Sequence, residues 1–137
     1  MNKRKYTARD RFFTVALVLT ALILNSGCTP REPLEPGRSF YNQIMGELQA
    51  SERRPLDSLW MASQRALEVL ELRIVAREKD ALSALLRARG AEGKEVKVRL
   101  EKVSDSTTLV KVKVDLLGDQ HQSQLILDQI LREMAND

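Results

Sequence analysis

Four stretches of the chain alternate apolar and polar residues with a period of two, over residues 72–77, 82–89, 96–100 and 110–114. The apolar positions are Leu72, Ile74 and Ala76; Leu82, Ala84, Leu86 and Ala88; Val96, Val98 and Leu100; and Val110, Val112 and Val114. Such alternation is typical of antiparallel strands with one buried face. Turn-forming residues separate the stretches at 79–80, 90–93 and 104–106, so the pattern predicts a four-stranded meander.

Two other stretches place apolar residues at the spacing of an amphipathic helix. The first opens at Pro55, whose missing N–H costs nothing at a helix start. Its stripe comprises Leu56, Leu59, Trp60, Ser63, Ala66, Leu67 and Leu70, and Trp60 is interpreted as core filling. The second should begin after Asp119, with Gln122 as its capping-box partner. Its stripe comprises Ser123, Ile126, Leu127, Ile130 and Met134.

Residues 40–50 fit two interpretations. Phe40, Ile44 and Leu48 have helical spacing, whereas Tyr41 and Gly46 also permit a strand. Each helix and each strand has one apolar face, and these faces can bury one another in two layers. The predicted fold class is therefore α+β, a two-layer sandwich. Its antiparallel meander sheet has four to five strands, and both helices pack on one face.

The N-terminal segment has the layout of a bacterial lipoprotein signal peptide. A basic start precedes an apolar run from Phe12 to Leu24, and Ser26 and Gly27 lead to Cys28, the only cysteine. The run of 13 residues is shorter than the ~20 that a spanning helix needs. The alternatives are an ordinary signal peptide with a free cysteine near the cut, or a short uncleaved anchor. One departure is Asn25, which stands where lipoprotein signals usually carry leucine.

The predicted organisation is a signal peptide over residues 1–27, a lipidated Cys28 with a proline-rich linker to residue 39, and one α+β domain over residues 40–137. The formal charge of +3 belongs largely to the discarded segment. Without residues 1–27 the chain keeps 17 basic and 18 acidic groups, a net charge of −1. Bulk charge therefore gives no support for nucleic-acid binding, and with Cys28 modified no disulfide can form within the chain.

Several segments resemble a bacterial family of small lipoproteins of unknown function. They are Gly46-Glu47-Leu48, the start Pro55-Leu56-Asp57 with Trp60 and Ala62, then Ala66-Leu67, Gly93, and a C-terminal motif. That motif reads Gly-Asp-x-x-x-Ser-x-x-Ile-x-x-x-Ile from Gly118 to Ile130. The resemblance implies a periplasm-facing lipoprotein and an additional first strand at residues 46–48, and it implies no activity. The family often has glycine where this chain has Asp115, which leaves the geometry of that turn open.

Lipidation at Cys28 would hold the protein on a membrane, because bacterial lipoproteins resembling this one carry three acyl chains and stable anchoring needs only two signals. Thr29 follows the cysteine, and the absence of aspartate there resembles the outer-membrane pattern. We therefore expect a location in the cell envelope, lipid-anchored, on the outer membrane and facing the periplasm if the cell is Gram-negative.

The polar phase of the strands is strongly basic. It contains Arg73, Arg77, Arg87, Arg89, Lys97, Arg99, Lys111 and Lys113, against the acids Glu95, Glu101 and Asp115. The expected hairpin register places Arg99 opposite Lys111 and Lys97 opposite Lys113, which destabilises each pair. Neutralising Lys97 and Lys111 should then raise thermal stability. The face is either a solvated surface that resists edge aggregation or a docking face for lipid headgroups, lipopolysaccharide phosphates or an acidic protein. Val75 and Leu85 are expected on it as neighbours.

No catalytic constellation is visible in the sequence. His121 is the only histidine and should be solvated, so neither a metal site nor a cofactor is predicted. Paired carboxylates are the only enzymatic route that remains open, for example in a hydrolase of envelope glycans or lipids. The leading function is a non-catalytic, membrane-anchored envelope lipoprotein that binds or scaffolds an envelope partner. The oligomeric state is left open, including self-association through a sheet edge.

Overall fold

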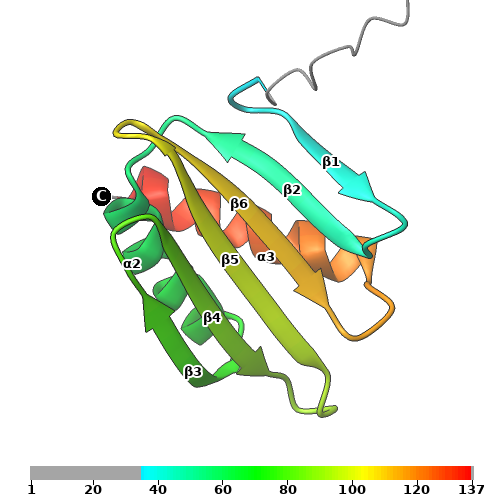
Figure 1. The fold of residues 1–137 in the computed structure, drawn as a ribbon. Coiled ribbons are helices and arrows are strands. Elements are labelled where there is room, and N and C mark those ends of the chain that lie inside the picture. The colour runs from blue at the N-terminus through cyan, green and yellow to red at the C-terminus, as the bar shows by residue number, and fades with distance from the viewer. Residues whose placement is uncertain (1–34, 137) are drawn as a thin grey trace, which may run out of the picture. The chain divides into compact units, whose positions relative to one another are not determined.

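The computed structural model describes residues 35–136, so the predicted signal peptide, Cys28 and the linker up to residue 34 lie outside it. In chain order the elements are β1 (Ser39–Asn42), β2 (Glu47–Glu52), α2 (Leu56–Val69), β3 (Arg73–Lys79), β4 (Ser83–Arg89), β5 (Glu95–Ser104), β6 (Thr107–Val114) and α3 (Gln120–Ala135). The six strands form one open sheet in the order β1-β2-β6-β5-β4-β3, with antiparallel neighbours throughout (Figure 1).

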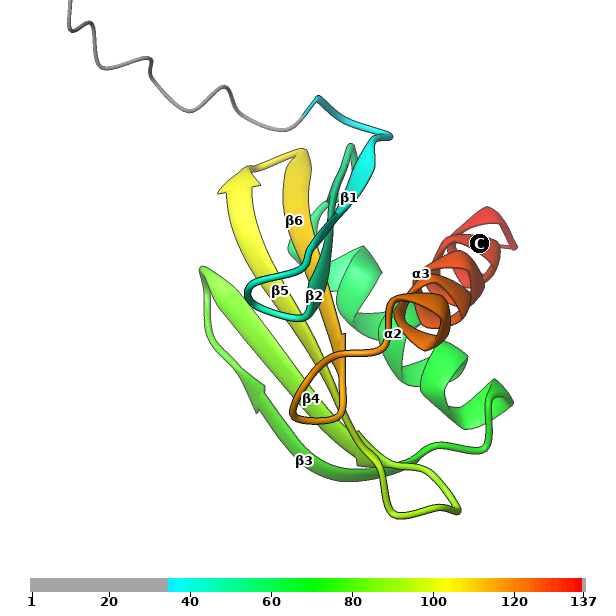
Figure 2. The ribbon, with the colours of Figure 1, turned by 90° about the vertical axis from the view of Figure 1, so that its right-hand side faces the viewer.

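Both helices cover the same face of the sheet (Figure 2). The core between the layers contains the predicted apolar phases of β4, β5 and β6, and these residues are all nearly inaccessible to solvent. Leu59, Ala66 and Leu67 of α2 and Ile126, Leu127 and Ile130 of α3 complete the core, and Trp60 and Met134 pack against its margin. The α+β class, the two layers and the meander β3-β4-β5-β6 are thus confirmed.

The strand count differs from the prediction, because the sheet has six strands rather than four or five. Residues 39–52 form a hairpin, and its turn closes when Asn42 Oδ1 accepts from the backbone N–H groups of Ile44 and Met45, at 3.1 Å each. Gly46 completes the turn with φ = 61°. Local hydrogen bonds therefore decide that residues 40–50 form strands rather than a helix. The helical spacing of Phe40 and Ile44 is coincidental, since both side chains are exposed.

The register of the central hairpin is as predicted. Leu100 lies opposite Val110, and Val98 lies opposite Val112. A shift of one residue would move every valine of β6 to the solvent side, so one-sided burial specifies this register. The cap of α3 is also as predicted in its first half, because Asp119 Oδ1 accepts from Gln122 N at 3.0 Å. Pro55 precedes α2 and contributes no side-chain cap.

A bulge in β3 overturns part of the predicted phase. Ile74 pairs with Ala88 but Ala76 pairs with Arg87, so Val75 is the extra residue. A bulge of one residue reverses the side of every residue after it. Ala76 and Glu78 therefore face away from the helices, whereas Arg77 shares the helix side with its partner Leu86. The expected Val75–Leu85 neighbour pair is wrong, since Leu85 lies opposite Glu78. Leu82 was also assigned to the buried phase, but it lies in the turn and is exposed.

Two glycines bring the β1–β2 loop and the β6–α3 loop into backbone contact. A Cβ on Gly46 would overlap the carbonyl oxygen of Leu117, and a Cβ on Gly118 would overlap the backbone of Gly46. Asp115, which stands where the resembled family often has glycine, adopts φ = 62°. Aspartate tolerates this left-handed conformation better than most residues, and its Oδ1 accepts from Leu116 N at 2.8 Å. Asp115 therefore adopts here a conformation that glycine would adopt without strain.

Replacing Gly118 by alanine should lower the free energy of unfolding by about 2–4 kcal/mol, because left-handed strain and a backbone collision act together. Gly93→Ala is the matched control: Gly93 has φ = 78°, but a Cβ there would meet nothing within 4 Å. Strain alone should make that change cost about 1 kcal/mol. Urea unfolding measures both variants, and equal losses would show that the loop contact is not constraining.

Candidate binding face

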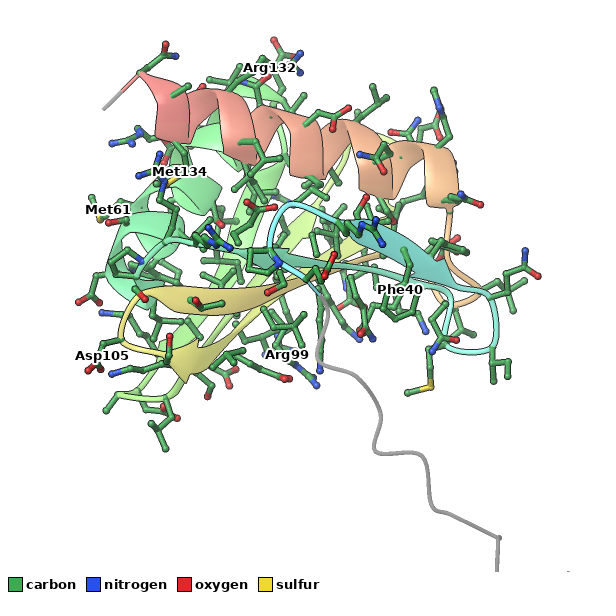
Figure 3. All side chains as sticks on the ribbon, turned by 90° about the horizontal axis from the view of Figure 1, so that it is seen from above. Phe40, Met61, Arg99, Asp105, Arg132 and Met134 are labelled. Carbon is green, nitrogen blue, oxygen red and sulfur yellow. The ribbon has the colours of Figure 1, made fainter. Side chains whose placement is uncertain are left out.

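The side of the sheet that the helices leave uncovered carries seven cationic residues. We call this set the basic face, and it comprises Arg73, Arg87, Arg89, Lys97, Arg99, Lys111 and Lys113. Six of them adjoin a buried apolar residue on their strand, and Arg73 adjoins the partly buried Ile74, so alternation places all seven on the outer side. Arg99 marks this side in Figure 3, where it points away from α3.

Like charges lie directly opposite one another at four places on the basic face, one of which places Arg87 of β4 opposite Lys97 of β5. Lys97 pairs with Lys113 and Arg99 pairs with Lys111, as predicted. Arg73 and Arg89 form another such pair at the other edge. Each arrangement destabilises the sheet by roughly 0.2–1 kcal/mol unless another charge intervenes.

Acidic side chains compensate some of these cations. Lys111 Nζ lies 2.8 Å from Glu101 Oε1, Arg87 lies 3.4 Å from Glu78 and Lys97 lies 3.8 Å from Glu95. Lys113 Nζ donates to the carbonyl oxygen of Met45 at 2.8 Å. Glu95 and Glu101 were expected on this face, whereas Asp115 lies in the turn after β6. Sequence reasoning missed Glu78 because of the bulge.

Three arginines of the basic face form no ion pair among residues 35–136, namely Arg73, Arg89 and Arg99, although Glu95 lies opposite Arg89 between β4 and β5. Arg87 is only partly satisfied, because its Nε is buried without a hydrogen-bond partner in the described part of the chain. Guanidinium groups present a planar fork of donors that matches carboxylate and phosphate oxygens. Arg73, Arg89 and Arg99 are therefore the members of the face that can still bind an anionic group.

Arg77 does not belong to the basic face, which corrects the sequence-based assignment. Its Nε donates to Gln64 Oε1 of α2 at 3.1 Å, and the next residue on the same side, Lys79, lies 2.5 Å from Asp57 Oδ1. The cause is the bulge at Val75, which turns the second half of β3 over. Both cations instead join the edge of the sheet to α2.

Carboxylates gather at the end of the sheet beside the start of α2. Asp57, Asp80 and Asp105 line an open pocket of about 570 Å³ together with Lys79 and Lys102. A hydrogen bond from Lys79 lowers the pKa of Asp57, and one from Lys102 lowers the pKa of Asp105. Hydrogen bonds from the Leu82 and Ser83 backbone lower the pKa of Asp80. Glycoside hydrolysis needs one carboxyl with a raised pKa to act as acid, and none of these three provides it.

Acids also line other depressions in the described part of the chain. Burial raises the pKa of Glu52, but its shallow pocket contains no second acid and is lined by Pro36, Gly37, Arg53 and Arg54. Glu78 and Glu101 share a depression of about 350 Å³, where each is ion-paired to a cation of the basic face. Among residues 35–136, the acids that share these depressions are therefore each held by an ion pair or a hydrogen bond.

Residues 35–136 contain no group of three His, Cys, Asp or Glu side chains that could hold a metal ion. His121 lies exposed in the first turn of α3. Within the same range, no helix combines the length and the apolar character that crossing a bilayer requires.

Comparison with known families gives one match. A family described as "Protein of unknown function (DUF3568)" matches residues 12–133. The chain belongs to this family. The match spans the α+β domain and extends back through Cys28 into the apolar run, so the expectation of an uncharacterised family is confirmed. No curated protein matches the chain.

The ion pairs change what neutralising the face should do. Arg99→Gln should raise the free energy of unfolding by roughly 0.2–1 kcal/mol, because Arg99 faces Lys111 and has no acid of its own. Lys111→Gln should lower it by up to about 1 kcal/mol, since Glu101 loses its partner. Urea unfolding at low salt measures both variants. A gain in stability for Lys111→Gln would favour the simple repulsion expected from the sequence.

Proposed function

We propose that this chain is a non-catalytic lipoprotein of the bacterial cell envelope, anchored through Cys28, whose basic face holds an acidic envelope partner. The observation that carries the proposal is the set of arginines that form no ion pair in the described part of the chain, Arg73, Arg89 and Arg99, on a sheet face that neither helix covers. A chain that is slightly acidic after residue 27 concentrates its cations there.

Sequence features around Cys28 support the lipid anchor. Cys28 is the only cysteine, and small residues separate it from an apolar run too short to span a bilayer. Three acyl chains on this residue would make release from the membrane negligible. Thr29 favours the outer membrane in a Gram-negative cell, with the domain in the periplasm.

A protein partner suits the basic face better than a small substrate does. Ladder-paired strands present a broad surface rather than an apolar cleft, whereas small-molecule sites are concave and largely apolar. Acidic side chains of a partner would relieve the Arg73–Arg89 and Arg99–Lys111 repulsions on binding. Electrostatic complementarity of this kind contributes to specificity and to the association rate.

Expression of the full chain in a Gram-negative host tests the anchor. We expect mass spectrometry of the mature N-terminus to show an acylated Cys28, and globomycin to cause accumulation of the unprocessed precursor. Cys28→Ser should also leave the precursor uncut, because the lipoprotein peptidase acts on the acylated cysteine. A mature protein with a bare thiol, or processing that globomycin does not affect, would contradict the anchor.

Photo-crosslinking in cells tests the face. A photoreactive residue at Leu109, which lies between Ser51 and Glu101 on the uncovered side, should capture an acidic envelope protein. The triple change Arg73→Glu, Arg89→Glu, Arg99→Glu should remove that crosslink. Arg132→Glu on the outer side of α3 is the matched control and should leave it intact (Figure 3). A crosslink that the triple change does not alter, or no crosslink at Leu109, would mean that the face is only solvated.

A further inference from the structure

Four large apolar side chains project together from one end of the sheet. Ile44 and Met45 lie on the β1–β2 loop and are 96% and 59% exposed. Leu116 and Leu117 lie on the β6–α3 loop and are 83% and 87% exposed. We call these four residues the apolar tip. The two loops lie side by side at the same end of the sheet (Figure 1).

The apolar tip is held by close backbone packing. Gly46 and Gly118 approach so closely that a Cβ on either would collide with the other loop, and the hydroxyl of Tyr41 closes on Gly118 from the core side. The four side chains are therefore presented by two loops that support each other. Exposure of this extent in a supported structure indicates a contact surface more than a loose turn.

Neighbouring side chains hydrogen-bond half of the backbone polar groups of the apolar tip. Asn42 Oδ1 accepts from the N–H groups of Ile44 and Met45, and Asp115 Oδ1 accepts from the N–H of Leu116. Lys113 Nζ donates to the carbonyl oxygen of Met45. Unpaired backbone groups are costly in a lipid environment. Three of its four N–H groups and one of its four carbonyl oxygens are thus occupied before the tip meets any partner.

The size and shape of the apolar tip disfavour a second copy as its occupant. Four side chains can bury roughly 600 Å² at most, whereas a stable protein interface buries about 800 Å² on each partner. The charges beside the tip, Lys113 and Asp115, have opposite signs. An apolar, nearly uncharged projection matches the interface of a bilayer better than it matches an acidic protein.

The predicted tether allows this contact. Seven residue steps separate Cys28 from Glu35, and they extend to as much as ~23 Å. From Glu35 the chain forms a turn, in which Arg38 N donates to the carbonyl oxygen of Glu35 at 3.2 Å. β1 contains four residues and spans ~13 Å. A domain whose Cys28 sits in the membrane can therefore turn the far end of β1, where the apolar tip lies, back onto the same membrane.

We infer that the apolar tip inserts into the interface of the phospholipid bilayer to which Cys28 is attached. The lipid anchor then supplies attachment and the tip supplies orientation, so that the sheet stands with its basic face open to the periplasm. This inference rests on the proposed anchor for its geometry, but the insertion itself is measured separately.

The test uses the full mature protein in vesicles of phosphatidylethanolamine and phosphatidylglycerol. An acylated Cys28 leaves no free thiol, so Leu117→Cys introduces the single site for a bimane label. Val103→Cys is the matched control, because Val103 is also apolar and 59% exposed but lies at the opposite end of the sheet. A shallow insertion of ~5–10 Å should give at least about twofold stronger quenching by nitroxide lipids at position 117 than at position 103.

Two further measurements separate the alternatives. Adding Leu116→Gln and Ile44→Gln to the Leu117→Cys protein should reduce its quenching to the level of position 103 with no change in melting temperature, since both side chains are exposed. Raising the salt concentration should leave the quenching unchanged, because insertion is apolar. Equal quenching at both positions, or a blue-shifted emission without lipid quenching, would overturn the inference in favour of a protein contact. The number of free thiols in the unsubstituted protein tests acylation of Cys28 independently, because a bare Cys28 would react with the label.

Discussion

Burial on one side only is the constraint on which the rest of this structure depends. Two helices cover one face of a six-stranded sheet, so each strand must place its apolar residues toward them and its polar residues away. That requirement specifies the register of β5 against β6, because a slip of one residue would exchange the valines of β6 for its lysines. The same requirement places the cations on the other side of the sheet. The register set by the buried residues determines which cations lie opposite one another.

The basic face is consequently a result of the register that the core requires. Acidic side chains of the chain compensate its positive charge only in part. Lys111, Lys97 and Arg87 have carboxylates within 4 Å. Arg73, Arg89 and Arg99 do not, and each lies opposite another cation. An uncompensated repulsion costs little on a solvated surface. Binding of an anionic partner would relieve it and so contribute to the affinity. The cations on the helix side of β3, in contrast, already contact α2, and the bulge that turns them inward also disrupts an exposed sheet edge.

The two ends of the sheet differ in chemistry. At one end, aspartates and lysines neutralise one another around the start of α2. At the other, two loops meet through glycines and present apolar side chains to solvent. The proposed anchor would give a domain with an apolar end and a basic side a defined orientation on a membrane, with the helices on the side away from the basic face. Fold and surface are both consistent with that arrangement.

Period-two alternation and helical stripes were enough to predict the α+β class, the meander, the two helices and two of the four opposed cation pairs. These features follow from local pattern, because burial selects one face of each element wherever the alternation is regular. Three features required the tertiary structure. The Asn42 turn converts residues 39–52 into a hairpin, a bulge at Val75 moves Arg77 to the helix side, and ion pairing decides which cations remain available. Each depends on contacts between residues on different elements or on a local departure from regular geometry, and neither leaves a periodic signal in the sequence.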